Sequence, residues 1–420
     1  MLDPSSPRAL GARFVFPVSS PPIANGVVTI RGGTIIGVGT EPLDCPVQDL
    51  GNVAILPGFV NAHTHLEFSD LPQPLGTPGM ALPDWIRQVI AHRQAAAGDA
   101  GHAVQLGLRE SLLAGTTGLG EIATTDWRHD PSIVGNDMPW VTMFFESIGP
   151  TRDRVATTAV AAEQFLSAST NDPQILPGLS PHAPYTVHTE LLTALVALSQ
   201  KFQVPLAMHL AESREELELL RCGGGPFREL LGDLNSWDPG PEARHSSILE
   251  YLQLLAQAPR ALVVHGNYLD AKEMKFIAAH AARMAVVYCP RTHHFFGHDP
   301  YPLAKMLKLG ITVGLGTDSR ASNPDLSLLA EMRHVAEHHP EVRPSTVLEL
   351  GTLAGARALG IENLAGSLQV GKRANLAILS LADSNVRDPH EMLFTKTAPV
   401  EQIWLNGQSA VYSQTTTGNS

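Results

Sequence analysis

The chain is poor in cysteine. It carries three among 420 residues, Cys45, Cys222 and Cys289, and no two of them form a Cys-x-x-Cys pair. So few, widely separated cysteines cannot build the disulfide framework of a small secreted domain. The missing pair also excludes the zinc signature of nucleic-acid deaminases. We therefore expect a protein of a reducing compartment.

Positive charge is also scarce. The 29 lysines and arginines are outnumbered by 41 aspartates and glutamates, which gives a formal net charge of −12. Proteins that bind nucleic acids present a basic face, so we expect no nucleic-acid partner. An acidic surface does not by itself identify any other partner.

Long hydrophobic runs are missing as well. No stretch approaches the roughly 18 uninterrupted apolar residues of a membrane-spanning helix. Residues 1–20 contain no apolar run preceded by basic residues, which is the pattern of a secretory signal. With 44% hydrophobic and 17% charged residues, the composition is that of a globular protein. The sequence therefore predicts a soluble, cytoplasmic protein with no membrane partner.

The pattern of apolar runs divides the chain into three parts. Residues 26–39, 366–381 and 399–412 are short β-rich segments, with Gly32-Gly33 and Asn406-Gly407 as turns. Between about residues 55 and 360, eight apolar runs alternate with helical stretches, which predicts an α/β fold, a (β/α)8 TIM barrel. We expect the barrel at 57–364, a small β-sandwich from 1–56 and 365–412, and a disordered tail at 413–420.

Histidines and acids gather where these apolar runs end. In a (β/α)8 barrel the chemistry lies at the C-terminal ends of the strands. Polar residues scattered by chance would not gather there. The candidates on the first, fourth, fifth, sixth and eighth runs are His63 and His65, His182, His209 and Glu212, His265, and Asp318.

His63 and His65 stand two residues apart in PGFVNAHTHLEFS. On a strand this spacing puts both imidazoles on one face, where they can bind one cation. A polar strand end with two solvated histidines would show the same spacing. His209 can supply a third nitrogen. Glu212 either reaches a bound substrate or is a first-turn carboxylate stabilised by the helix dipole.

Asp318, in GLGTDS, can bind a metal and take a proton from a bound water. The alternative is a helix N-cap, but Asp325 directly precedes LSLLAEM and is the better predicted cap. A single histidine such as His265 is more often structural than catalytic. A catalytic role is predicted for it only because the other candidate residues also lie at strand ends. Three histidines and one aspartate suit zinc or iron better than magnesium or calcium. A metal with an open coordination position makes hydroxide at neutral pH, so the constellation predicts hydrolysis.

Four segments in this order, PGFVNAHTHLEFS, HLAES, HGN and GLGTDS, resemble the amidohydrolase superfamily. The resemblance covers nearly the whole chain and implies a metal-dependent hydrolase on a (β/α)8 barrel with a small β-sandwich. The segment LSPHAPYT lacks the lysine that bridges two metals in binuclear members, which implies the mononuclear deaminase branch. It is similar to aminofutalosine, S-adenosylhomocysteine and methylthioadenosine deaminases, with chlorohydrolases as relatives. CPRTHHFFGH departs from the CPxSN of many adenosine-type members.

The resemblance also implies residue roles. It implies one divalent metal, zinc first and iron second, held by His63, His65, His209 and Asp318. The implied catalytic groups are Asp318 and His265, which take a proton from the water, and Glu212, which protonates the substrate ring. By the same resemblance His182 contacts the substrate, and Glu67 holds its ribose hydroxyls.

The predicted reaction is hydrolytic release of ammonia from an aminated purine nucleoside or similar heterocycle, by attack of hydroxide formed at the metal. One alternative keeps the scaffold and cleaves an amide or a carbon–halogen bond. A second alternative is a non-catalytic binding barrel, which would need a missing ligand or acid–base group. The sequence leaves open the oligomeric state, with a homodimer as one option, and the roles of Arg291, His293, His294 and His298.

Overall fold

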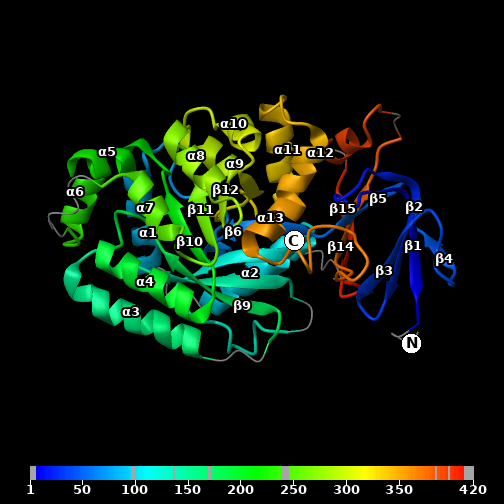
Figure 1. Ribbon diagram of the computed structural model, residues 1–420, viewed down its shortest axis with the longest axis horizontal. Helices are drawn as coiled ribbons and strands as arrows, with labels where there is room; N and C mark the ends of the chain where they lie inside the picture. Colours follow the sequence, from blue (N-terminus) through cyan, green and yellow to red (C-terminus); the bar gives the residue numbers. More distant parts are fainter. Residues whose placement is uncertain are drawn as a thin grey trace, which may run out of the picture.

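The protein consists of a barrel wrapped in helices and a smaller β-sheet built from both ends of the chain (Figure 1). The computed structural model describes residues 6–95, 100–135, 138–168, 172–237, 246–383, 386–395 and 398–410. The tail predicted at 413–420 lies outside these residues. Among the residues described, no helix is long and apolar enough to cross a membrane.

The barrel is a parallel sheet in which strands that follow one another in the chain are also neighbours in space. The predicted (β/α)8 fold class is therefore confirmed. Two amides, those of Thr317 and Asp318, donate to the carbonyl oxygen of His63 and join the last strand to the first. The strands are β6 (Phe59–Thr64), β7 (Thr116–Ala123), β8 (Trp140–Ser147), β9 (Ile175–Pro181), β10 (Leu206–Leu210), β11 (Ala261–His265), β12 (Met284–Tyr288) and β13 (Thr312–Leu315).

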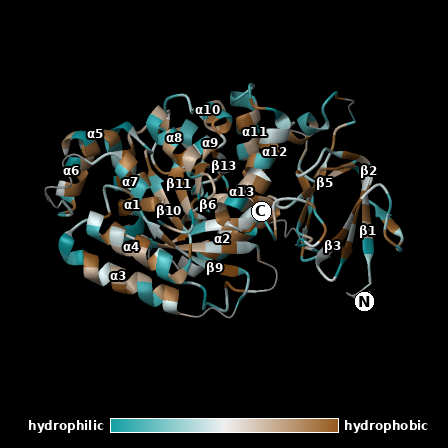
Figure 2. Ribbon diagram, viewed as in Figure 1, coloured by the Kyte–Doolittle hydropathy of each residue, from teal (hydrophilic) through white to brown (hydrophobic). Residues whose placement is uncertain are grey.

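Barrel strands are buried on both faces, since side chains fill the interior and helices cover the outside. Every residue of β6, β7, β10, β11 and β12 is buried, and Figure 2 shows the mixed hydrophobic and hydrophilic faces of the surrounding helices. Two glycines let the neighbouring backbone close on β6. A Cβ at Gly120 would lie 2.4 Å from the carbonyl oxygen of Ala62, and one at Gly316 would lie 2.9 Å from Cβ of His63.

The helices lie around the barrel (Figure 1). Helices follow the barrel strands, as the predicted alternation of apolar runs and helical stretches requires. The bounds are α1 (Leu82–Ala95), α2 (Ala100–Leu113), α3 (Arg152–Ser167), α4 (Thr189–Phe202), α5 (Arg214–Cys222), α6 (Pro226–Asp233), α7 (Ile248–Leu255), α8 (Ala271–Ala279), α9 (Pro290–Phe296), α10 (Leu303–Lys308), α11 (Leu328–His338), α12 (Pro344–Glu349) and α13 (Gly355–Leu359).

The prediction that Asp325 caps the helix after the eighth strand is wrong. Helix α11 begins at Leu328, and its N-cap is Ser327, whose side chain accepts a hydrogen bond from the amide of Ala330. The Asp325 carboxylate accepts from the amide of Ser327 at 2.9 Å and pairs with Arg291 at 2.7 Å. A short acidic side chain readily bonds the amide two residues on, which turns the chain before the helix starts.

The second sheet joins the two ends of the chain. Its strand order is β16-β15-β14-β5-β1-β2-β3, with β4 also paired to β1. It encloses its own apolar cluster, which includes Leu10, Ile55 and Trp404. The turns at Gly32-Gly33 and Asn406-Gly407 are confirmed. The bounds are β1 (Arg8–Val15), β2 (Ile23–Arg31), β3 (Thr34–Gly39), β4 (Val47–Asp49), β5 (Val53–Pro57), β14 (Leu376–Ser380), β15 (Val400–Leu405) and β16 (Gln408–Ser409).

One apolar run that was predicted as a single strand forms two strands in the structure. The apolar run at residues 54–63 divides at Gly58 into β5, which belongs to the terminal sheet, and β6, which begins the barrel. A Cβ at Gly58 would meet the side-chain oxygen of Thr117 at 2.1 Å, so the junction needs glycine there. The predicted domain limits at residues 56 and 364 stay predictions.

Candidate active site

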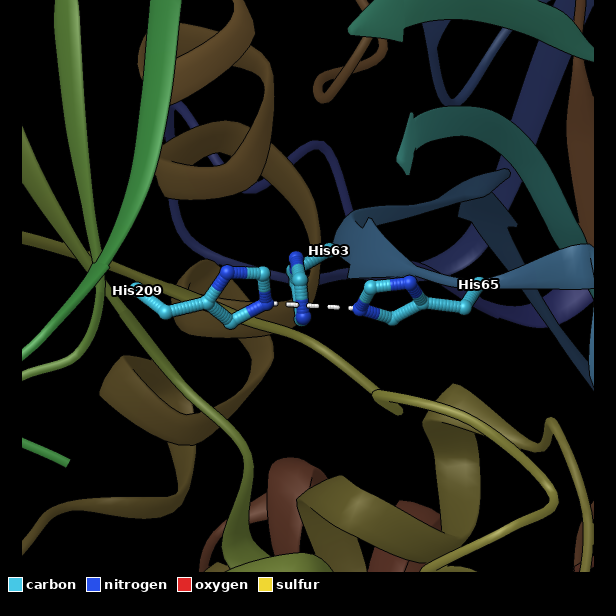
Figure 3. Close-up of side chains that lie close together, drawn as sticks. All are labelled: His63, His65 and His209. Atoms are coloured by element: carbon cyan, nitrogen blue, oxygen red, sulfur yellow. Dashed lines mark hydrogen bonds between the residues drawn. The ribbon is translucent and has the colours of Figure 1, made fainter. Parts of the chain in front are cut away.

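Three histidines from two strands meet inside the barrel mouth. His63 lies on β6, His65 directly follows that strand, and His209 lies on β10; all three are buried. In Figure 3 the rings of His65 and His209 point at each other, and the ring of His63 lies close to both, with its centroid 4.9 Å from each. The three side chains offer ligand atoms that all lie within 4.8 Å of one another.

The imidazoles of His65 and His209 favour the neutral form, which presents a free lone pair. Nδ1 of His209 lies 2.9 Å from the carbonyl oxygen of His182, so it carries the proton and leaves Nε2 as a lone-pair donor. Burial, followed by the nearby His63, lowers the pKa of both His65 and His209 well below the ordinary value. Within the described chain, neither ring nitrogen of His63 has a hydrogen-bond partner.

This arrangement fits one shared cation. Two nitrogens that each lie about 2.0–2.1 Å from a tetrahedral zinc are about 3.4 Å apart. Nε2 of His65 and Nε2 of His209 are 3.3 Å apart. Oδ1 of Asp318 lies 3.6 Å from Nε2 of His63 and 3.7 Å from Nε2 of His65. Three nitrogens and one carboxylate oxygen therefore converge as the donor set of a zinc- or iron-type ion.

Asp318 is fixed by its backbone and by a neighbouring hydroxyl. Its φ of 55° lies in the left-handed region, which is strained for a residue with a side chain. The amide of His65 donates to its carbonyl oxygen, and the hydroxyl of Ser322 donates to Oδ2 at 2.8 Å. Burial alone would raise the pKa of Asp318, but the adjacent His63 and His265 outweigh burial and lower it. The carboxylate therefore stays ionised.

Glu212 and His265 form a second pair beside these residues. Oε1 of Glu212 lies 3.3 Å from Nε2 of His265, and both side chains are buried. Burial, then the negative charges of Asp318 and Glu216, raise the pKa of Glu212 well above its ordinary value. Burial lowers the pKa of His265. The pair therefore favours a protonated carboxyl group and a neutral imidazole, which can donate and accept a proton at neutral pH.

The alternative reading of Glu212 as a first-turn carboxylate does not match its position. Helix α5 begins at Arg214 with Ser213 as its N-cap, and the acids of its first turn are Glu215 and Glu216. Glu212 precedes the cap. Asp318 likewise caps no helix, since the next helix is α11.

Hydrogen bonds that sequence reasoning missed fix the backbone of Glu212. The buried Glu216 carboxylate accepts hydrogen bonds from the amides of Ala211 at 3.0 Å and Glu212 at 2.7 Å. Ala211 has a φ of 54°, so these bonds hold a strained turn at the strand end. On the other side, Nδ2 of Asn267 donates to the carbonyl oxygen of Glu212 at 2.9 Å.

A cavity of about 210 Å³ opens over the site. Its inner end contains the predicted groups His65, His209, Glu212, His265 and Asp318. The outer walls are largely apolar and include Phe68, Leu82, Trp85, Ile86, Val89, Ile90, Leu230, Leu231 and Leu234. The cavity can therefore enclose a flat polar ring that carries an apolar extension.

Of the two predicted substrate-binding residues, His182 lines the cavity and Glu67 does not. His182 lines the cavity, with Nδ1 2.6 Å from Oγ1 of Thr186 and with its pKa lowered to about 3 by burial. Glu67 is not among the lining residues. Its carboxylate pairs with Arg93 at 2.5 Å and accepts a hydrogen bond from Thr124 at 3.0 Å. Arg93, in turn, lines the cavity.

Sequence reasoning missed several polar lining residues, among them Glu146 and Arg93. Glu146 is the second-last residue of strand β8, and its Oε1 lies 4.0 Å from Nε2 of His182. The same strand-end rule that selected the histidines would have found it, since WVTMFFES is one of the eight apolar runs. Arg93 comes from α1, and nothing in its spacing distinguishes it from an ordinary surface arginine.

The histidines of the loop after the seventh strand lie away from the cavity lining. His298 is 3.2 Å from the hydroxyl of Tyr268, and His293 packs edge-on against Tyr288. His294 lies against α11. Arg291 is paired with Asp325 and Glu331 and so joins α9 to α11.

Comparison with known proteins gives matches over most of the chain. The model of the Amidohydrolase family matches residues 54–410. The chain is 28% identical over 353 residues to an aminodeoxyfutalosine deaminase of Deinococcus radiodurans, covering 80% of this chain and 81% of the relative. It is 26% identical over 419 residues to a 5-methylthioadenosine/S-adenosylhomocysteine deaminase of Pyrococcus furiosus, covering 93% and 91%.

Solved structures share the fold. The aminofutalosine deaminase of Helicobacter pylori in complex with methylthio-coformycin has a TM-score of 0.83 at 21% identity, covering 96% of this chain and 100% of that one. An adenosine deaminase of Xanthomonas campestris with bound zinc has a TM-score of 0.74 at 22% identity, covering 96% and 92%.

Proposed function

The chain belongs to the amidohydrolase family, as its four sequence motifs indicated, and we propose that it is a hydrolytic deaminase. Its substrate would be an aminated purine nucleoside or similar heterocycle, and its product ammonia. The observation that carries this proposal is the buried Glu212 in the cavity over the histidine cluster: its Oε1 lies 3.3 Å from Nε2 of His265, and burial raises its pKa, which favours the protonated acid. The relatives named as deaminases support the same chemistry.

We assign one divalent metal, zinc before iron, to His63, His65, His209 and Asp318. The 3.3 Å separation between Nε2 of His65 and Nε2 of His209 supports this set. The zinc-bound structural neighbour supports zinc as the first choice. When bound there, such an ion acts as a Lewis acid that lowers the pKa of water to about 7 and so provides hydroxide at neutral pH.

The side chains then divide the proton transfers. The ionised carboxylate of Asp318 accepts a proton from the attacking water, and His265 assists at Nε2. Glu212 donates its carboxyl proton to the ring nitrogen beside the amine-bearing carbon, which makes that carbon a better electrophile. The ionised Glu212 then takes the remaining hydroxyl proton from the attacked carbon and passes it to the departing amine, which leaves as ammonia. The proton held by Asp318 returns Glu212 to its protonated state. General acid–base help of this kind contributes about 10²–10⁴-fold.

The cavity suggests how a nucleoside would lie. His182 and Glu146 offer a polar patch next to the histidine cluster, and the apolar walls would enclose a hydrophobic extension of the sugar. Glu67 is proposed to act on the substrate through Arg93, which it orients by their ion pair. This assignment replaces the direct contact with ribose hydroxyls that the sequence resemblance implies.

The acidic charge and the few cysteines support a reducing, cytoplasmic location without a nucleic-acid partner. A homodimer stays a prediction.

The proposal is tested by measuring ammonia release over a panel of aminated nucleosides, aminofutalosine, free bases and pterins. The Glu212→Gln variant, purified in parallel, controls for a contaminating deaminase. Deamination of at least one nucleoside by the wild type and its near absence in the variant are expected. Release of chloride or a carboxylate without ammonia would favour the alternative hydrolase, and no turnover of any kind would favour a binding barrel.

A further inference from the structure

A second group of three histidines lies outside the active site. It consists of His294 on α9 and His334 and His338 on α11, two helices that pack against each other (Figure 1). Each side chain offers one ligand atom, and these atoms all lie within 4.8 Å of one another. His294 and His338 are exposed and His334 is half-buried. None of the three lines the active-site cavity.

The rings are arranged as ligands rather than as a hydrogen-bonded cluster. His334 and His338 stand four residues apart, on one face of α11, with their rings stacked at 3.9 Å. Nδ1 of His338 lies 2.9 Å from the carbonyl oxygen of His334, so it holds the proton and leaves Nε2 with a lone pair. Within the described residues, the rings of His294 and His334 contact other histidine rings rather than hydrogen-bond partners.

The local charges also tolerate a cation. The positive charge of Arg291, on the same helix as His294, is neutralised by ion pairs with Asp325 and Glu331, each at 2.7 Å. His338 is the last residue of α11, where the helix dipole favours positive charge.

We propose that His294, His334 and His338 form a second metal site, which binds a divalent transition ion of the zinc, nickel or copper type and clips α9 to α11. Three imidazoles without a carboxylate select nitrogen-seeking ions over magnesium and calcium. The clip lies one turn beyond the Arg291 ion pairs, which already join the same two helices. Metal binding at this second site does not depend on the reaction proposed for the active site.

The ion would brace one wall of the substrate cavity. Helix α9 carries Phe296, whose ring packs edge-on against Trp85 at 5.3 Å, and Trp85 lines that cavity. The carbonyl oxygen of Phe295 accepts a hydrogen bond from the amide of Gly79 at 2.7 Å. Fixing α9 to α11 therefore also fixes the segment before α1.

Zinc content measured against buffered free zinc tests the proposal. Metal-stripped full-length protein is titrated with zinc and its bound zinc measured by elemental analysis, for the wild type, H334Q/H338Q and H294Q. The matched control is H102Q/H129Q, which removes two exposed histidines elsewhere. The measured quantity is the difference in bound zinc between each variant and the wild type. This difference does not depend on ammonia release or on how much zinc the active site binds.

We expect H334Q/H338Q to bind one zinc equivalent fewer than the wild type and H102Q/H129Q to match the wild type. H294Q, which keeps the helical pair, should bind that equivalent at least about tenfold more weakly, since losing even an outer-shell partner costs about 10–100-fold. Equal zinc content in the wild type and H334Q/H338Q would overturn the site. An equal loss in H102Q/H129Q would do the same, and unchanged affinity in H294Q would overturn the clip.

Discussion

Replacing Glu212 by glutamine should remove most of the turnover while leaving the protein and its metal intact. The amide has the same shape as the carboxyl group but has no acid proton to transfer. Its position should be kept, because the backbone is held by Glu216 on one side and by Asn267 on the other. The substitution therefore isolates the proton-transfer role of this side chain.

The expected loss follows from that role. General acid–base catalysis contributes about 10²–10⁴-fold, which corresponds to about 3–5 kcal/mol of transition-state stabilisation. We expect kcat to fall by that factor and KM to change little, since Glu212 protonates the ring only as the water attacks. Metal content should equal that of the wild type, because Glu212 is outside the proposed ligand set.

Steady-state kinetics and elemental analysis on the same preparations measure both quantities. Glu215→Gln is the matched control, since it makes the same chemical change three residues further on, in the first turn of α5. It should retain wild-type kcat. A Glu212→Gln enzyme with more than about a tenth of wild-type kcat and full metal would refute the general-acid role.

Three further predictions follow from the same geometry. His209→Ala should lose bound metal by elemental analysis while His102→Ala keeps it; full occupancy in the first variant would remove His209 from the ligand set. Chelation should abolish ammonia release and added zinc should restore it, whereas activity that survives complete metal removal would contradict the proposed nucleophile. Burial raises the pKa of Glu216 to about 7, from the 4.5 of an unperturbed glutamate. Because the folded protein keeps this proton after the unfolded chain has released it, stability should fall as pH rises from about 4.5 to 7, by roughly 3 kcal/mol relative to Glu216→Gln. Denaturant unfolding at pH 5 and pH 7 checks this, and parallel pH dependences in the two proteins would contradict it.

The strand pattern and the strand-end rule predicted much of the fold. The apolar runs alternate with helices, and parallel strands place their carboxyl ends at one rim, so residues as distant as His63 and Asp318 could be expected together. The structure brings His63, His65, His209, Glu212, His265 and Asp318 within one site. The short helices between β12 and β13 were not predicted, since α9 and α10 are too brief to show a helical period.

Other details depend on tertiary contacts that no local pattern contains. Asp325 looked like a helix cap because it precedes an apolar run, but its ion pair with Arg291 and the turn at Ser327 delay the helix. Glu67 follows the histidine pair closely, yet Arg93 from the next helix engages its carboxylate. In both cases the ion-pair partner, Arg291 or Arg93, comes from another helix. The role of the acidic residue therefore depends on a contact that forms only when the chain folds.

Ammonia release, measured together with metal content in a single preparation of the wild-type protein, tests the central claim most directly. The account predicts stoichiometric ammonia from at least one aminated purine nucleoside or related heterocycle, with a rate that rises in proportion to bound divalent metal. A fully metal-loaded protein that releases no ammonia from any member of the substrate panel would contradict it.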